Sequence, residues 1–194
     1  MAIAPQLEAR VGAVLEGVAR ILAWCGGIIL VGIAVLTVAS ITGRALIVIG
    51  LSPIRGDFEL VEAGCAIAIF CFLPWCQLRR GHVTVDVLVA RFPLRLQAFL
   101  GLVGDILIAL AAGVILWRIW LGLGEKFPYG SDGLRDAMGF GMRPFFVETT
   151  YELELPIWIP YAAATAGAAV FFIVALYTVW RSLNWTLQGA EGRA

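Results

Sequence analysis

Few ionisable side chains interrupt this apolar sequence, and the first of them that could do chemistry is Asp105. Of 194 residues, 61% are hydrophobic and 14% charged, whereas a soluble domain has roughly 25% charged residues. Asp105 lies inside the apolar run 96–117, and a carboxylate at mid-span costs about 2.5 to 3.5 kcal/mol to insert. It either marks an ion path or forms a hydrogen bond across a helix bundle, and we favour the hydrogen bond.

A second pair of carboxylates precedes another apolar run. Glu59 and Glu62 are three positions apart, so on a helix they share one face. There they could meet Arg44 or Arg55 from the preceding connection, or a basic residue of a partner. By themselves they do not make a transport site.

The histidine of this chain has a restricted set of possible roles. His82 is the only one, so a haem held by two histidines of one chain is excluded. It lies beside Arg79 and Arg80 at an expected membrane surface, which disfavours an intramembrane serine protease. His82 and Asp86 could bind a metal or relay a proton, but two ligands leave a metal site incomplete. We therefore interpret the pair as a contact that fixes a loop.

Several classes of function are disfavoured by what the sequence lacks. It has no phosphate-binding loop of the Gly-x-x-x-x-Gly-Lys-[Ser/Thr] type, so ATP hydrolysis has no recognisable site. Its 14 basic residues balance its 14 acidic residues, which disfavours nucleic acid as a partner. The cysteines lie in apolar runs and match no metal or redox motif, so we expect no catalytic, cofactor or metal site.

Long uncharged runs predict the fold class, an all-α membrane protein with four transmembrane helices. A helix crosses a ~30 Å hydrocarbon core with about 20 residues, and in lipid such runs must be helical to satisfy their backbone polar groups. The whole chain, 1–194, is expected to form a single membrane domain. The spans are expected at about 21–43, 57–78, 96–118 and 155–180.

Three segments outside the spans are also distinctive. Residues 1–20 have apolar side chains at helical spacing with charges between them, which predicts an amphipathic segment at the membrane interface rather than a cleaved signal peptide. Residues 77–92 suggest a turn and a short interfacial arm between the second and third helices. The loop at about 124–154 is rich in glycine and proline, which indicates an ordered loop or short helices outside the membrane.

The distribution of positive charge predicts the orientation. Arginines in both terminal tails and in the loop between the second and third helices fall on one side of the membrane. Because the short loops on that side carry more arginine than those opposite, both termini should be cytoplasmic.

Three stretches together resemble the small membrane subunit of tripartite ATP-independent periplasmic (TRAP) transporters. The first is residues 56–62, Gly-Asp-Phe-Glu-Leu-Val-Glu, with Glu59 at the position of the family's recurrent glutamate. The second and most specific is residues 77–86, Gln-Leu-Arg-Arg-Gly-His-Val-Thr-Val-Asp, followed by Phe92 and Pro93. The third is residues 149–161, which resemble the start of the family's fourth helix. Arg44 also falls where the family tends to place an arginine.

The resemblance implies a non-catalytic role in a bacterial inner membrane. In that family the small subunit packs against a large ion-coupled membrane subunit, partly through membrane lipids, and a periplasmic solute-binding protein delivers the solute, typically an organic acid. Polar residues that could specify this docking, or stabilise the chain itself, are Arg44, Glu59, Glu62, Arg80, His82, Asp86 and Asp105. Segment 127–147 is longer than the family's usual connection and could contact the binding protein or the large subunit.

A second class of function remains open. The chain could be a self-sufficient, proton-coupled carrier or exporter that works as a homodimer, with Glu59, Glu62 or Asp105 as the titrating group. Four helices without an inverted repeat or a broken helix make this the weaker hypothesis.

Overall fold

The computed structural model describes residues 3–81 and 93–188, which form four long helices and two short ones. The long helices are α1 (Pro5–Ala45), α2 (Asp57–Leu78), α4 (Leu94–Lys126) and α6 (Trp158–Gln188). The short ones are the 3₁₀ helix η1 (Ile47–Ile49) and α5 (Asp132–Met138). Each of the four long helices is long and apolar enough to cross a membrane. The all-α fold with four transmembrane helices is therefore confirmed.

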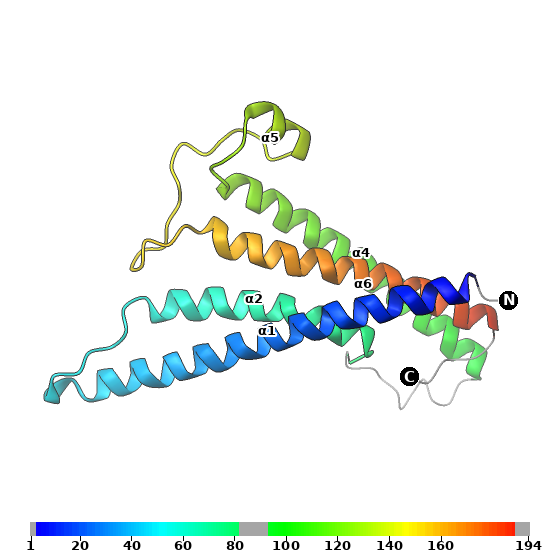
Figure 1. The fold of residues 1–194 in the computed structure, drawn as a ribbon, viewed down its shortest axis with the longest axis horizontal. Helices are drawn as coiled ribbons and strands as arrows, with labels where there is room; N and C mark the ends of the chain where they lie inside the picture. The colour runs from blue at the N-terminus through cyan, green and yellow to red at the C-terminus, as the bar shows by residue number, and fades with distance from the viewer. Residues whose placement is uncertain (1–2, 82–92, 189–194) are drawn as a thin grey trace.

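The helices pack as a row in the spatial order α1, α2, α6, α4. Neighbouring pairs in this order make nearly all contacts between elements. In Figure 1 the pair α1 and α2 diverges from the pair α4 and α6 toward the end that carries η1 and α5. Helix α6 is central. Half of the most apolar stretch of α6 is buried inside the protein, whereas only 6% of the corresponding stretch of α1 is buried.

Helix α1 includes the segment expected to be separate. It runs for 41 residues from Pro5 to Ala45 without a break at residue 20, because no proline interrupts it after Pro5. At ~1.5 Å per residue it is roughly 60 Å long, about twice the thickness of a hydrocarbon core. Residues 5–20 thus continue the first span as helix, and their position at the membrane surface stays a prediction.

The remaining helix ends follow local sequence. Gly56 precedes α2 with φ +70°, a left-handed conformation that suits glycine, and Asp57 and Glu59 lie in the first turn, where the helix dipole favours carboxylates. Pro93 precedes α4, which continues to Lys126, past the expected end at 118. The expected arm falls in residues 82–92, outside the described residues.

Candidate functional site

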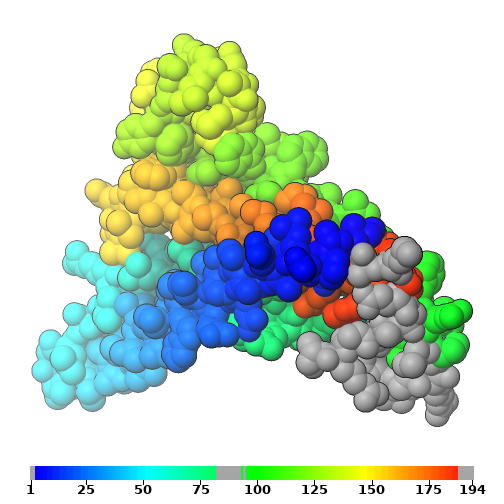
Figure 2. Space-filling view, turned by 45° about the vertical axis from the view of Figure 1, so that its right-hand side comes forward, coloured from blue at the N-terminus to red at the C-terminus, as the bar shows by residue number. Residues whose placement is uncertain are grey.

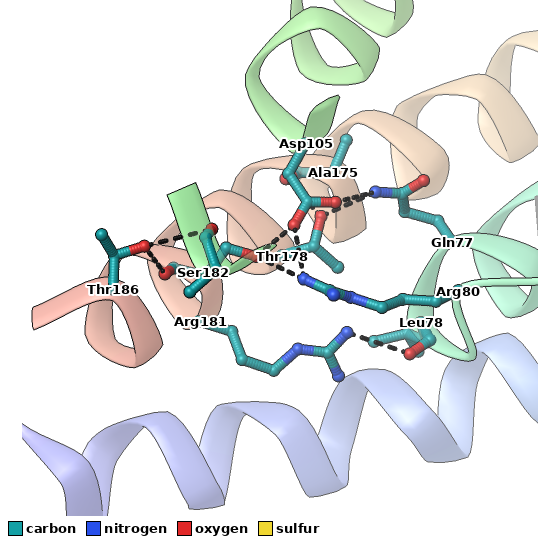
Figure 3. A network of polar contacts seen from close by, with 10 residues as sticks. Gln77, Leu78, Arg80, Asp105, Ala175, Thr178, Arg181, Ser182 and Thr186 are labelled. Atoms are coloured by element: carbon teal, nitrogen blue, oxygen red, sulfur yellow. Dashed lines mark hydrogen bonds and ion pairs between the residues drawn. The ribbon is translucent and has the colours of Figure 1, made fainter. Parts of the chain in front are cut away.

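The buried carboxylate of Asp105 lies where three helices meet. Asp105 is 6% exposed, and its Oδ1 accepts a hydrogen bond from Nε2 of Gln77 at 3.1 Å. Its Oδ2 accepts from Nη2 of Arg80 at 3.3 Å and from the hydroxyl of Ser182 (Figure 3). One carboxylate on α4 is therefore bonded to the end of α2 and to α6.

Two partners of Asp105, Gln77 and Arg80, also donate hydrogen bonds to hydroxyl groups on α6. Nε2 of Gln77 donates to Oγ1 of Thr178 at 2.8 Å, and Nη2 of Arg80 donates to Oγ of Ser182 at 2.9 Å. Thr178 and Ser182 are four apart on α6, so they present both hydroxyls on one face. We call Gln77, Arg80, Asp105, Thr178 and Ser182 the Asp105 network.

The same region stabilises the end of α2. Nη2 of Arg181 donates to the carbonyl of Leu78 at 3.1 Å, one of the carbonyls that a helix end leaves without an intrahelical partner. Arg80 follows with φ +50°, a conformation that is unfavourable for a residue with a side chain. Its contacts with Asp105 and Ser182 offset that cost and hold the turn after α2 against α6.

The charge balance of this network indicates what it can do. The guanidinium of Arg80 neutralises the carboxylate of Asp105, and both carboxylate oxygens accept hydrogen bonds from the protein. Buried polar groups that are paired in this way fix the relative position of the elements that carry them. The arrangement is that of an interhelical connection, the interpretation that the sequence favoured for Asp105.

Glu59 binds a loop rather than an arginine. Its carboxylate accepts hydrogen bonds from the backbone N–H groups of Glu152 at 2.7 Å and Leu153 at 3.1 Å. In return, the carboxylate of Glu152 accepts a hydrogen bond from the backbone N–H of Gly56. The side chain of Leu153 packs so closely against Gly56 that a Cβ at this position would clash with it. This reciprocal set, the Glu59 anchor, attaches the loop before α6 to the start of α2.

Arg44 pairs with Asp57 instead of with Glu59 or Glu62. Its Nη2 lies 3.7 Å from Oδ2 of Asp57, which also accepts a 2.5 Å hydrogen bond from Oγ of Ser40. These contacts join the end of α1 to the start of α2. Because more than half of the side chain of Arg44 is exposed, its ion pair contributes little by itself.

Glu62 lies one helical turn beyond Glu59 and is exposed. Both residues line a cavity of about 570 Å³ whose walls also include Phe70 and Tyr161. His82 and Asp86 fall outside the described residues, so their expected contact stays a prediction.

A further buried arginine organises the loop between α4 and α6. Arg135 on α5 is 1% exposed. Its guanidinium donates to six backbone carbonyls, including those of Gly124 at 2.8 Å and Phe127 at 2.6 Å. This set of contacts, the Arg135 clamp, completes the hydrogen bonding at the end of α4 and folds the chain back over it. Segment 127–147 is consequently an ordered cap, seen above α4 in Figure 1.

Thr178, Ser182 and Arg135 were not among the candidate residues of the sequence, and Gln77 appeared there only as the first residue of the family-like stretch 77–86, without a role. For the two hydroxyl residues a signal existed, because polar side chains four apart in an apolar run indicate one shared buried face. The roles of Gln77 and Arg135 had no comparable local signal, since their partners come together only in the folded chain.

Four apolar helices joined by buried polar contacts define a multi-pass membrane protein. The family model described as the DctQ component of tripartite ATP-independent periplasmic transporters matches residues 33–184. The chain therefore belongs to this family, a component of a transporter in the inner membrane, and the resemblance seen in the sequence is confirmed. No curated protein and no solved structure matches the chain.

Proposed function

We propose that this chain is the non-catalytic small permease subunit of a TRAP-type uptake system for organic acids. It packs against and stabilises the large ion-coupled subunit, which receives solute from a periplasmic binding protein. The observation that carries this proposal is the Asp105 network: the carboxylate within the helix bundle is neutralised by Arg80 and bonded to two other helices. A carboxylate bonded in this way supports a scaffold role, because buried polar groups that are paired fix the relative position of the helices that carry them.

We further propose that both termini lie in the cytoplasm. An even number of spans places both ends of the chain on the same side of the membrane. The two ends are in contact, since the backbone N–H of Ile3 donates to Oδ1 of Asn184 at 2.8 Å. The arginines near this end, among them Arg20, Arg79 and Arg181, are what the positive-inside rule expects of a cytoplasmic face.

Segment 127–147 is proposed to contact the binding protein or the outer face of the large subunit. The Arg135 clamp holds the part of this segment from Phe127 to Met142 at the end of α4, while Met142, Phe145 and Phe146 are each at least 75% exposed. Changing Phe145 and Phe146 together to serine leaves the clamp intact and should lower uptake. Normal uptake and normal assembly of that variant would remove this part of the proposal.

The experiment that tests the main proposal is co-expression with the large membrane subunit. Purification by a tag on this chain should recover the large subunit in a stoichiometric complex, and an unrelated tagged four-helix protein serves as the control. Recovery of this chain alone, together with uptake by vesicles that contain only this chain, would support the homodimeric carrier instead.

His82 and Asp86 are proposed to contribute to that assembly. His82→Ala or Asp86→Ala should lower the yield of complex more than it changes the apparent affinity for solute. A strong shift in affinity at an unchanged yield would contradict this role.

A further inference from the structure

Two exposed arginines from different helices lie over the ring of Trp75, near the end of α2. Cζ of Arg20 on α1 is 5.9 Å from the ring centre, and Cζ of Arg79 is 4.8 Å from it, within the range of cation–π attraction. The indole ring is itself held in place, because it packs against a buried apolar cluster that joins α1, α2 and α6. We call Arg20, Trp75 and Arg79 the Trp75 cluster.

The two guanidinium groups of this cluster share one carboxylate. Nη2 of Arg20 is 3.1 Å and Nη2 of Arg79 is 2.7 Å from the same oxygen, Oε1 of Glu16. Each guanidinium has five N–H donors, and among residues 3–81 and 93–188 neither arginine has a further hydrogen-bond partner. Because more than half of each arginine side chain is exposed, most of these donors can reach a ligand at the surface.

Arg181 adds a third positive charge to the same end of the bundle. Its Nη2 donates to the carbonyl of Leu78, the residue before Arg79, and within the part of the chain that the structure describes no carboxylate forms an ion pair with it. Three guanidinium groups therefore surround the single paired carboxylate of Glu16. This end of α2 has more positive than negative charge.

The neighbouring charges do not cancel this excess. The guanidinium of Arg80 is paired with the carboxylate of Asp105. The carboxylate of Glu8 accepts a hydrogen bond from Asn184, and Arg10, two positions along, offsets its charge in number. The excess positive charge favours an anion as the ligand.

The three arginines lie where the apolar spans end. Each is the first charged residue beyond an apolar run: Arg20 before 21–43, Arg79 after 63–78 and Arg181 after 155–180. The folded chain brings all three to the end of the bundle at which the first half of α1 lies across α6 (Figure 2). The layer directly outside the hydrocarbon is that of the phospholipid headgroups, where tryptophan is also enriched.

We propose that the Trp75 cluster binds the phosphate of an anionic phospholipid headgroup. Arg20 and Arg79 donate to the phosphate oxygens, for which the planar guanidinium has matching geometry, and the charge of Arg181 adds to the attraction. Phosphatidylcholine has a cation of its own, which the excess positive charge repels, so the site selects anionic lipids. A headgroup held by both arginines connects α1 to α2 at the membrane surface, whatever solute the transporter carries.

The test measures how strongly the chain prefers an anionic lipid. The full chain is placed in phosphatidylcholine nanodiscs, and the association of spin-labelled phosphatidylglycerol relative to spin-labelled phosphatidylcholine is determined by electron paramagnetic resonance. The variants are Arg20→Gln, Arg79→Gln and the two together. The matched control is Arg55→Gln with Arg118→Gln, which removes two exposed arginines from other parts of the chain. Circular dichroism verifies the fold of each variant.

We expect each single variant to lower the preference for phosphatidylglycerol about fivefold and the double variant more than about tenfold, because each arginine near the surface contributes to the attraction independently. The control should change the preference less than about twofold. Glu16→Gln should raise the preference, because the phosphate then has no carboxylate to compete with for the two guanidinium groups.

Four results would overturn the proposal. Equal association of both lipids with the wild type would show that the site does not select anionic lipids. An unchanged preference in the double variant would show that the two arginines do not form the site, and an equal loss in the control would show an effect of net charge alone. Displacement of spin-labelled phosphatidylglycerol by inorganic phosphate as effectively as by unlabelled phosphatidylglycerol would show that the ligand is free phosphate rather than a lipid.

Discussion

Replacement of Asp105 by alanine tests whether its carboxylate connects helices or carries ions. The variant removes the acceptor for Gln77, for Ser182 and for the guanidinium of Arg80. Breaking a buried ion pair by removing one partner costs about 3 to 5 kcal/mol. Because the side chain of Arg80 is 32% exposed, water partly solvates the charge that is left, and we expect the lower limit, about 3 kcal/mol.

The measurement is thermal unfolding of the purified chain in detergent, followed by tryptophan fluorescence. For a protein of this size about 3 kcal/mol corresponds to a fall in Tm of about 6 to 12 °C. Glu125→Ala serves as the matched control, since Glu125 is an exposed carboxylate on the same helix and should change stability by less than about 0.5 kcal/mol.

A double variant separates the ion pair from the loss of packing. Arg80→Gln removes the charge with an unbranched side chain, as the left-handed backbone at φ +50° requires. Asp105→Ala with Arg80→Gln should therefore cost less than the sum of the two single variants, by about 1 to 3 kcal/mol. If Asp105→Ala keeps the Tm and the assembly of the wild type but abolishes uptake by the complex, the carboxylate belongs to an ion path and our reasoning is refuted.

Two further predictions concern the ends of the helices. Arg135→Lys should increase the rate of proteolysis within 127–147 at least tenfold while the four long helices persist. The reason is that one ammonium group cannot replace a planar guanidinium that donates to six carbonyls. An unchanged cleavage rate would contradict the Arg135 clamp. Glu59→Gln should speed hydrogen exchange at the amides of Glu152 and Leu153 by about tenfold, the equivalent of roughly 1.4 kcal/mol, because a single amide oxygen replaces two carboxylate oxygens. Glu62→Gln is the control, and equal protection in both variants would remove the Glu59 anchor.

The four helices could be predicted because the membrane leaves the backbone little choice. A long uncharged run in lipid must be helical, so counting gaps between charges was sufficient to find them. The length of α1 was harder to foresee, since the charges at Glu8, Arg10, Glu16 and Arg20 mark where an apolar span begins but not where a helix begins.

The polar contacts depend on folding in a way that local patterns do not reveal. Asp105 could be identified as costly, but its partners Gln77 and Ser182 lie 28 positions before it and 77 after it. Arg44, Arg55 or a basic residue of a partner were the contacts considered for Glu59 from the sequence, yet backbone amides of a loop more than 90 positions away bind it. Arg135 resembled any exposed charge in a polar loop until its six carbonyl partners came together around it.

We propose that this chain supports a transporter without carrying solute by itself. The most direct measurement is uptake of a radiolabelled organic acid, delivered by the cognate binding protein, into liposomes that hold an imposed ion gradient. We predict accumulation when the large subunit and this chain are reconstituted together, and none when this chain is reconstituted singly at the same density. Gradient-driven accumulation by the single chain would contradict the account.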